Sequence, residues 1–349
     1  MDQYSEIIEI NGKKLTSKFI EGLSYEEREE LVVPIFDHFR KVGFLIPSED
    51  DEDLRKEYQR LIDLEVDPEQ MDWFNNSSLG TNICKQFCHK SFFGSRGSKK
   101  EKTMEELFND DAKMLKTIRN RLGMDWLISD RKGPGVNEAF NFSFKMLIQG
   151  FRSQRLISPI SMFKPNVAKF MALRYSKEGE TVGDMSCGFG GRMLGTMAAK
   201  RKYVGTDPLT VPELQKMADF YGFEHVKLIK DGSENYRGAE NSIDLYWSSP
   251  PYFDQEIYSN DENQAYSKGK EYFFDVYLKR TLENVRFMLK PGKWFGLNIK
   301  NVPGAIELAK EHFGDVVEEV RLRTVRSHLN KSAGTTKFES IFMFKNGKI

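Results

Sequence analysis

The second half of the chain alternates short apolar runs with stretches of helical length, and this alternation constrains the fold more than any other feature. Strands and helices that alternate in this way form a parallel sheet with helices on both faces. Each run has the length and the residue types of a buried strand. The runs are TVGDMS (181–186), KYVGTD (202–207), HVKLIKD (225–231), IDLYWS (243–248) and KWFGLNI (293–299).

The last part of the chain departs from this alternation. Two strand-like runs, VEEVRLRTVRS at 317–327 and TKFESIFMF at 336–344, are joined by a short loop with no helix between them. Strands joined so directly pair antiparallel, because a parallel pair needs a long crossover connection. We therefore expect a Rossmann-like α/β fold with a mostly parallel sheet of seven strands that ends in an antiparallel hairpin.

The first half of the chain has the sequence pattern of helices. Ser24 and Thr103 each open a capping box with a glutamate three residues later, which is the signature of a helix start. The sequence therefore predicts a mainly helical region over residues 1–156, a candidate for substrate recognition, followed by an α/β domain over residues 157–349. The helices expected in the first region lie near 24–41, 51–63, 81–93 and 103–122.

Composition indicates a globular protein of a reducing compartment. The chain is 39% hydrophobic and has no apolar run near the ~20 residues of a membrane-spanning helix, so we expect a soluble, cytoplasmic protein without a membrane partner. Three cysteines are too few for a disulfide framework. Cys84, Cys88 and His89 share one short stretch, which is either a metal site or a helix that buries two small thiols. We expect the helix and no metal.

The formal net charge is zero, but the charges are unevenly spread. Residues 94–155 carry 13 basic and 8 acidic side chains, and residues 321–349 carry 7 basic side chains with Glu339 as their single acid. A local basic face suffices for contacts with phosphates, so the zero net charge does not exclude a nucleic acid as partner. Solvated helix faces would give the same pattern.

Glycine and carboxylate side chains follow the first three predicted strands. The stretch DMSCGFGG, residues 184–191, ends the first strand, and its glycines allow a sharp turn that brings the backbone close to a ligand. Asp207 and Asp231 end the next two strands, in position to bind ribose hydroxyls and an adenine amino group. Each acid alone is more often a cap or a turn residue, but three acids in register along one sheet edge favour a ligand site. The glycine spacing is neither that of a dinucleotide-binding turn nor that of a P-loop, which favours a nucleoside without a pyrophosphate.

The fourth predicted strand ends in Ser249, Pro250, Pro251 and Tyr252, at the same edge of the sheet. Proline fixes φ and removes a backbone donor, so this strand end is rigid and extended. A planar base could stack on Tyr252 while its exocyclic amino group donates to Ser249 and to the carbonyl of Pro250. The alternative is a rigid turn between a strand and a loop. The polar segment 253–274 that follows is either a loop over this base pocket or a plain solvated connection.

Together these motifs resemble the S-adenosylmethionine-dependent DNA amino-methyltransferases, which methylate the exocyclic nitrogen of cytosine or adenine. The resemblance covers residues 157–349 and implies the class I methyltransferase fold. It also implies that the serine-proline tetrapeptide holds a base flipped out of DNA, with cytosine N4 favoured over adenine N6 because serine comes first. A lysine-proline segment before a helix would pack beside the methionine end of the cofactor. The implied cofactor-binding residues are Lys164, Pro165, Asp184, Ser186, Gly188, Gly190, Asp207, Asp231 and Ser249, and the implied catalytic residues are Ser249, Pro250, Pro251 and Tyr252.

The same motifs allow other interpretations. A methyltransferase of the tRNA guanine-N2 type uses a similar tetrapeptide on RNA, and an enzyme that hypermodifies viral DNA would keep both binding sites. A nucleic-acid-binding subunit with a relic methyltransferase fold would predict a damaged glycine turn, whereas Asp184, Gly188 and Gly190 are intact. In each case basic residues near the expected sheet edge would contact phosphates. The candidates are Arg152, Arg155, Arg326, His328 and Lys331.

Overall fold

The computed structural model divides the chain into two compact units. Met1–Asp51 and Phe92–Ile160 form the first unit, and Glu52–Ser91 and Ser161–Ile349 form the second. Residues 52–91, which the sequence assigns to the N-terminal region, therefore pack with the α/β unit. The residues that the structure describes are 3–69, 78–98, 100–124, 140–158, 160, 162–251, 257–259, 264–299, 302, 304–324 and 337–347.

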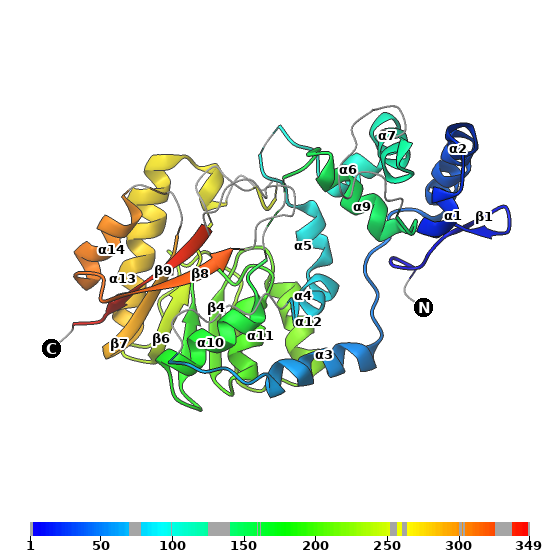
Figure 1. The fold of residues 1–349 in the computed structure, drawn as a ribbon. Helices are drawn as coiled ribbons and strands as arrows, with labels where there is room; N and C mark the ends of the chain where they lie inside the picture. Colours follow the sequence, from blue (N-terminus) through cyan, green and yellow to red (C-terminus); the bar gives the residue numbers. More distant parts are fainter. Residues whose placement is uncertain are drawn as a thin grey trace. The chain divides into compact units, whose positions relative to one another are not determined.

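The helices of the first unit can be followed in Figure 1. They pack around a cluster of aromatic side chains. The ring of Phe44 contacts Phe93, Phe108 and Phe144, and its centroid lies 5.3 Å from that of Phe144. A short antiparallel hairpin precedes the helices. The sequence pattern did not predict this hairpin. The elements are β1 (Glu9–Ile10), β2 (Lys13–Lys14), α1 (Ser17–Glu21), α2 (Tyr25–Val42), α6 (Met104–Phe108), α7 (Asp111–Arg121) and α9 (Phe144–Ser153).

Side-chain caps decide where helices of the first unit begin. Ser24 and Thr103 both form complete capping boxes, as predicted. The helix expected over 103–122 is two helices, because the carboxylate of Asp110 accepts a hydrogen bond from the backbone N–H of Lys113 and so starts α7. The cap at Asp110 thus lies inside the predicted range, and the one predicted helix is two helices, α6 and α7.

The second unit contains a seven-stranded sheet with the strand order β5-β4-β3-β6-β7-β9-β8. Neighbouring strands from β5 to β7 are parallel, whereas β9 pairs antiparallel with both β7 and β8. The predicted sheet, mostly parallel with a terminal hairpin, is confirmed. The strands are β3 (Thr181–Asp184), β4 (Lys202–Thr206), β5 (Val226–Ile229), β6 (Ile243–Ser248), β7 (Leu289–Asn298), β8 (Glu318–Thr324) and β9 (Lys337–Lys345).

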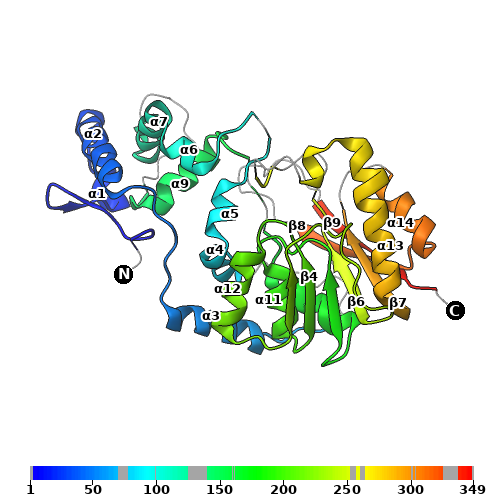
Figure 2. The same ribbon diagram turned by 180° about the vertical axis from the view of Figure 1, so that it is seen from behind.

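Helices cover both faces of this sheet (Figure 1), as the view from behind also shows (Figure 2). Helix α10 packs against Trp247 on one face, which we call the α10 face. Helices α13 and α14 pack against Phe295 on the other face. The helices are α3 (Asp51–Asp63), α4 (Thr81–Phe87), α5 (His89–Gly94), α10 (Pro165–Tyr175), α11 (Gly191–Ala198), α12 (Val211–Tyr221), the 3₁₀-helix η1 (Ala265–Ser267), the π-helix η2 (Tyr272–Leu278), α13 (Lys279–Met288) and α14 (Ala305–Phe313).

A buried lysine fixes α3 to the α/β unit. The Lys169 ammonium, on α10, donates hydrogen bonds to the carbonyl oxygens of Leu61, Ile62 and Leu64 at 3.1, 2.7 and 2.7 Å. These carbonyls belong to the end of α3, where a helix leaves its last acceptors unpaired and its dipole favours a cation. Helices α3 and α4 also contact α12 through aromatic rings. This N-terminal segment is therefore part of the second unit.

Candidate active site

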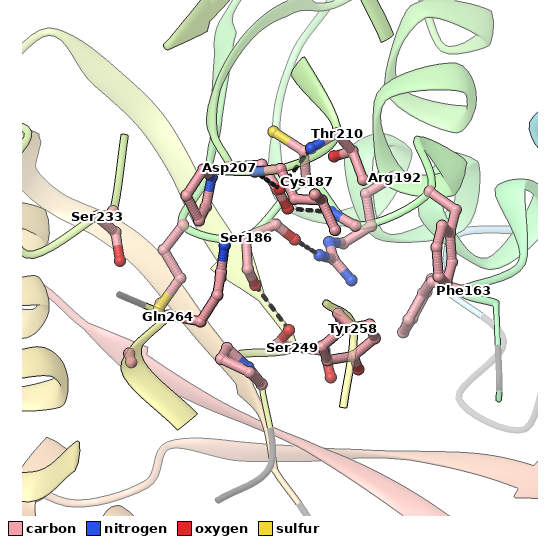
Figure 3. Close-up of a pocket in the computed structure, with 18 of the residues that line it drawn as sticks. Phe163, Ser186, Cys187, Arg192, Asp207, Thr210, Ser233, Ser249, Tyr258 and Gln264 are labelled. Atoms are coloured by element: carbon pink, nitrogen blue, oxygen red, sulfur yellow. Dashed lines mark hydrogen bonds between the residues drawn. The ribbon is translucent and has the colours of Figure 1, made fainter. Parts of the chain in front are cut away.

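A pocket of about 620 Å³ lies at the carboxyl ends of the parallel strands in the second unit (Figure 3). Chain order reverses between β3 and β6, and open α/β sheets bind ligands at such a reversal. Neighbouring strands each contribute a residue to the lining. These residues are Ser186 after β3, Asp207 after β4, Asp231 after β5, Ser249 after β6 and Asn298 at the end of β7.

The glycine turn between β3 and α11 has the backbone that the sequence predicts. Gly188 and Gly190 have φ of 55° and 83°, in the left-handed region that side chains other than glycine rarely adopt. A Cβ at Gly191 would collide with the carbonyl of Phe163. Gly188 and Gly191 line the pocket, whereas Gly190 lies beneath it against Leu214. The glycines therefore serve both a tight turn and close packing of the chain around the pocket.

Asp207 holds the turn and the start of the next loop together. One carboxylate oxygen accepts from the backbone N–H of Gly188 at 3.0 Å, and the other accepts from Leu209 and Thr210 at 2.9 Å each. The side chain is 8% exposed and lines the pocket. Burial raises its pKa above the ordinary value, although these hydrogen bonds oppose the shift. The carboxylate retains acceptor capacity toward the pocket.

Asp184 lies under the turn and does not line the pocket. Its carboxylate accepts hydrogen bonds from Arg192 Nε at 2.8 Å, from the Tyr203 hydroxyl at 2.7 Å and from the Ser248 hydroxyl at 2.6 Å. Arg192 also donates to the carbonyl of Ser186 (Figure 3). Burial lowers the pKa of Arg192, whereas Asp184, Tyr203 and Cys187 together raise it, and the net shift is upward. The partners of Asp184 are protein groups, which makes it a positioning residue for the turn.

Arg192 is a residue of the pocket that the sequence did not single out. It is buried, lines the pocket and lies with its guanidinium 5.4 Å from the centre of the Phe163 ring. Its place in the sequence, directly after the glycine turn, could have suggested that Arg192 lines the pocket. The sequence does not show which residues pack above the turn, so it does not predict what the arginine contacts.

The lysine-proline segment begins helix α10 at the pocket. Lys164 precedes the helix and lines the pocket, and Pro165 occupies the first helical position, where its missing N–H costs nothing. Burial lowers the pKa of Lys164, with no described carboxylate contributing. Pro165 does not line the pocket but packs against Gly80 and Gly195. Lys164 thus lines the pocket, and its ammonium has no ion-pair partner among the described residues.

Asp231 lies at the rim of the pocket and is exposed. Its Oδ1 accepts from the backbone N–H of Gly232 at 2.7 Å and from the Asn235 amide at 2.9 Å. This geometry is that of a turn residue, the alternative that the sequence left open. The other carboxylate oxygen has no such bond among the described residues. Asp231 can therefore hold the turn and still accept a hydrogen bond from an adenine amino group.

Hydrogen bonds join the strand end of β6 to the glycine turn. The Ser186 hydroxyl donates to the carbonyl of Ser249 at 2.7 Å (Figure 3). Ser249 and Pro251 line the pocket, whereas Pro250 is buried and does not. Tyr252 lies outside the described residues. The sequence-predicted turns after β3 and β6 therefore meet at one place.

Part of the segment 253–274 also lines the pocket. Its described members Tyr258, Gln264, Lys268 and Tyr272 belong to the lining, which favours a loop over the pocket rather than a plain connection. The Tyr258 ring lies 6.2 Å from that of Phe189 in the glycine turn.

None of the residues predicted to contact phosphate belongs to the described lining of this pocket. Arg152 and Arg155 belong to the first unit. Arg152 is half-buried over Phe92, and burial lowers its pKa, whereas Arg155 is exposed. Arg326, His328 and Lys331 lie outside the described residues. The role of all five in binding phosphate stays a prediction.

The described ranges contain no group of three or more His, Cys, Asp or Glu side chains that could hold a metal ion. Cys84 and Cys88 are buried thiols, as the helical interpretation predicts, and the helix expected over 81–93 divides at Cys88. No helix of these ranges is long and apolar enough to cross a membrane.

Comparisons with known proteins give distant structural neighbours only. No protein-family model matches the chain, and no curated protein matches it. TrmN from Thermus thermophilus is 12% identical, with a TM-score of 0.36, over 52% of this chain and 48% of its own. The 16S rRNA methyltransferase RsmC from T. thermophilus, solved with AdoMet and guanosine, is 16% identical with a TM-score of 0.36, over 54% and 44%. The N-methyltransferase NodS from Bradyrhizobium japonicum is 14% identical with a TM-score of 0.37, over 52% and 94%.

This chain thus spans about half the length of the first of these neighbours. At these identities and TM-scores the neighbours carry no argument about function, and the fold assignment rests on the sheet itself. Its strand order, with an antiparallel hairpin at one end, is that of the class I methyltransferase fold. The finer resemblance to DNA amino-methyltransferases stays a prediction.

Proposed function

We propose that this chain is an S-adenosylmethionine-dependent methyltransferase that acts on the exocyclic amino group of a base in nucleic acid. The hydrogen bond from Ser186 to the Ser249 carbonyl carries the proposal. It joins the glycine turn, the expected cofactor side, to the serine-proline turn, the expected base side. A single pocket then serves both reactants.

The residues of the pocket fit this cofactor. The buried carboxylate of Asp207 offers acceptors to ribose hydroxyls, and Asp231 offers a carboxylate at the rim to an adenine amino group. The unpaired ammonium of Lys164 suits the carboxylate of a methionine moiety. When bound, the cofactor supplies a methyl group on a positively charged sulfur.

The chain's own contribution to the chemistry is to hold the amino nitrogen. This nitrogen is a poor nucleophile because its lone pair is conjugated with the ring. The Ser249 hydroxyl would accept one N–H of this amino group and draw the nitrogen toward tetrahedral geometry, which frees the lone pair, so positioning supplies much of the rate. The sequence also predicts the Pro250 carbonyl as an acceptor, but Pro250 is not in the described pocket lining. The proton leaves to water after the methyl has moved, and no strong base is needed.

Experiment decides whether the substrate is DNA or RNA. The resemblance favours cytosine N4 in DNA, because serine begins the tetrapeptide. An amino group in RNA fits the same acceptors equally well, and RNA is the second candidate. In a duplex the base must leave the stack before it reaches the pocket.

Ser249→Ala tests the proposal directly. We expect transfer of labelled methyl from S-adenosylmethionine to DNA or RNA of the expression host to fall about 10- to 100-fold, because one acceptor of the amino group is lost. Mass spectrometry of the digested nucleosides names the product. Ser242→Ala is the matched control, because Ser242 directly precedes the opposite end of β6. Failure of the wild type to label either nucleic acid would refute the proposed substrate class.

A further inference from the structure

Asn298 belongs to the pocket lining and carries a buried acceptor that has no partner among the described residues. It is the last residue of β7 and is 0% exposed, yet it belongs to the pocket lining. Its Nδ2 donates to the carbonyl of Ser340 at 3.0 Å. Because a carbonyl only accepts, this bond fixes which end of the amide carries the oxygen. The oxygen, Oδ1, has no partner among the described residues.

A buried acceptor of this kind is expected to have a partner in the working protein. Nearly all buried polar side-chain atoms in proteins are hydrogen-bonded, and one left unpaired destabilises the fold. No described protein group donates a hydrogen bond to Oδ1, and because Asn298 lines the pocket, a molecule bound there can supply the donor. A base amino group brings two donors to this pocket under the proposed function.

Strand register places Asn298 beside Ser249. Strands β6 and β7 are parallel, and their last recorded pair is Ser248 with Leu297, so Ser249 and Asn298 are the next residues of the two strands. Side chains alternate between the faces of a sheet. Trp247 and Trp294 both pack on the α10 face, and Ser249 and Asn298 follow them by even numbers of residues. Both side chains therefore share that face if the alternation continues past Ser248.

The spacing of the two strands suits an amino group. An NH₂ group directs its two hydrogens about 120° apart, and with hydrogen bonds of about 2.9 Å its two acceptors lie about 5 Å from each other. Neighbouring strands are about 4.8 Å apart. Acceptors at the same level of β6 and β7 therefore match the two N–H groups, whereas Pro250 does not line the pocket.

We propose that Oδ1 of Asn298 accepts one N–H of the target amino group while the Ser249 hydroxyl accepts the other. This inference rests on the proposed function and adds a catalytic residue to it. The nitrogen lone pair forms the new N–C bond, and the electrons of the breaking C–S bond go to sulfur. One N–H proton then leaves to water, because a neutral amide does not hold it. The residue acts on any base that carries an exocyclic amino group.

Two substitutions at Asn298 separate the acceptor from the fold. Asn298→Leu removes the acceptor at similar volume, whereas Asn298→Asp keeps an oxygen there. The matched control is Asn346→Leu, because Asn346 is 1% exposed and its Nδ2 donates to the Leu289 carbonyl, outside the pocket lining. We measure single-turnover methyl transfer to the DNA or RNA that the wild type labels, calorimetric binding of S-adenosylhomocysteine, and thermal unfolding.

We expect Asn298→Leu to slow transfer about 10- to 100-fold with unchanged S-adenosylhomocysteine affinity. Asn298→Asp should stay faster than the leucine variant, and Asn346→Leu should lower the unfolding temperature without slowing transfer. A leucine variant as fast as the wild type would mean that water alone satisfies Oδ1 and would overturn the inference. Loss of S-adenosylhomocysteine binding in parallel with rate would also overturn it. Absence of any wild-type labelling would instead refute the proposed function on which the inference rests.

Discussion

Asp207→Asn isolates the charge of one buried carboxylate with the smallest change of shape. The amide oxygen can keep the bonds from Leu209 and Thr210, whereas the NH₂ group then faces the N–H of Gly188, which loses its acceptor. One buried donor left unpaired costs about 1–3 kcal/mol. We expect the free energy of unfolding in urea to fall by that amount.

The affinity for S-adenosylmethionine should also fall in this variant. Hydrogen bonds to a charged partner contribute about 1.5–3 kcal/mol, which corresponds to a loss of about 10- to 100-fold when the ribose hydroxyls no longer meet a carboxylate. Isothermal calorimetry with S-adenosylmethionine measures this. Asp219→Asn serves as control, because Asp219 bonds Gln215 on the surface of α12 and does not line the pocket. Wild-type affinity in Asp207→Asn would refute the assignment of Asp207 to the ribose.

The pH dependence follows from the raised pKa of Asp207. Its folded pKa lies above its ordinary value of 3.8, so its contribution to stability is present below pH 3.8 and is lost as pH rises through the folded pKa. Ribose binding needs the ionised form and has the opposite dependence. Affinity for S-adenosylmethionine should therefore fall as pH is lowered through the folded pKa. Asp207→Asn should show no such fall, and a parallel fall in this variant would contradict the assignment to Asp207.

Two further predictions concern the architecture of the second unit. Arg192→Met leaves the buried Asp184 carboxylate without its cation, and the free energy of unfolding in urea should fall by about 3–5 kcal/mol. Adding Asp184→Asn should recover part of the loss, and no recovery would contradict the role of the ion pair. Lys169→Met removes the charged donor at the end of α3, so amide exchange in Asp51–Asp63 should speed up about 10-fold. Exchange no faster than in Lys216→Met, a change at an exposed position, would show that Lys169 does not hold α3.

The elements of the second unit were predictable because local periodicity encodes burial. Leu278, Leu282 and Val285 recur at helical spacing and are each 0% exposed. The same spacing continues to Leu289, but Leu289 begins β7, and the turns that precede α13 form the π-helix η2. Periodicity thus identified the buried face, whereas its ends depended on neighbouring elements.

The division of the N-terminal half could not be predicted from the same signals. Nothing in the sequence of α3 shows that Lys169, more than a hundred residues later, ends it and attaches it to the second unit. Likewise the break at Asp110 depends on whether its side chain caps a helix or meets solvent. In both cases the result depends on which partner a polar group binds, and a local sequence pattern does not specify that partner.

The sequence by itself determined which strand ends carry glycine, carboxylate and the serine-proline turn, because these residue types constrain the backbone wherever the chain folds. Only the tertiary structure decided which ends are neighbours. The position of β6 between β3 and β7 brings Ser186 to Ser249 and places Asn298 next in register. The pairing of strands so far apart in sequence depends on how helices bury both faces of the sheet. The role of a polar residue at the end of an apolar run therefore depends on which strand lies beside it, and the local sequence does not specify that neighbour.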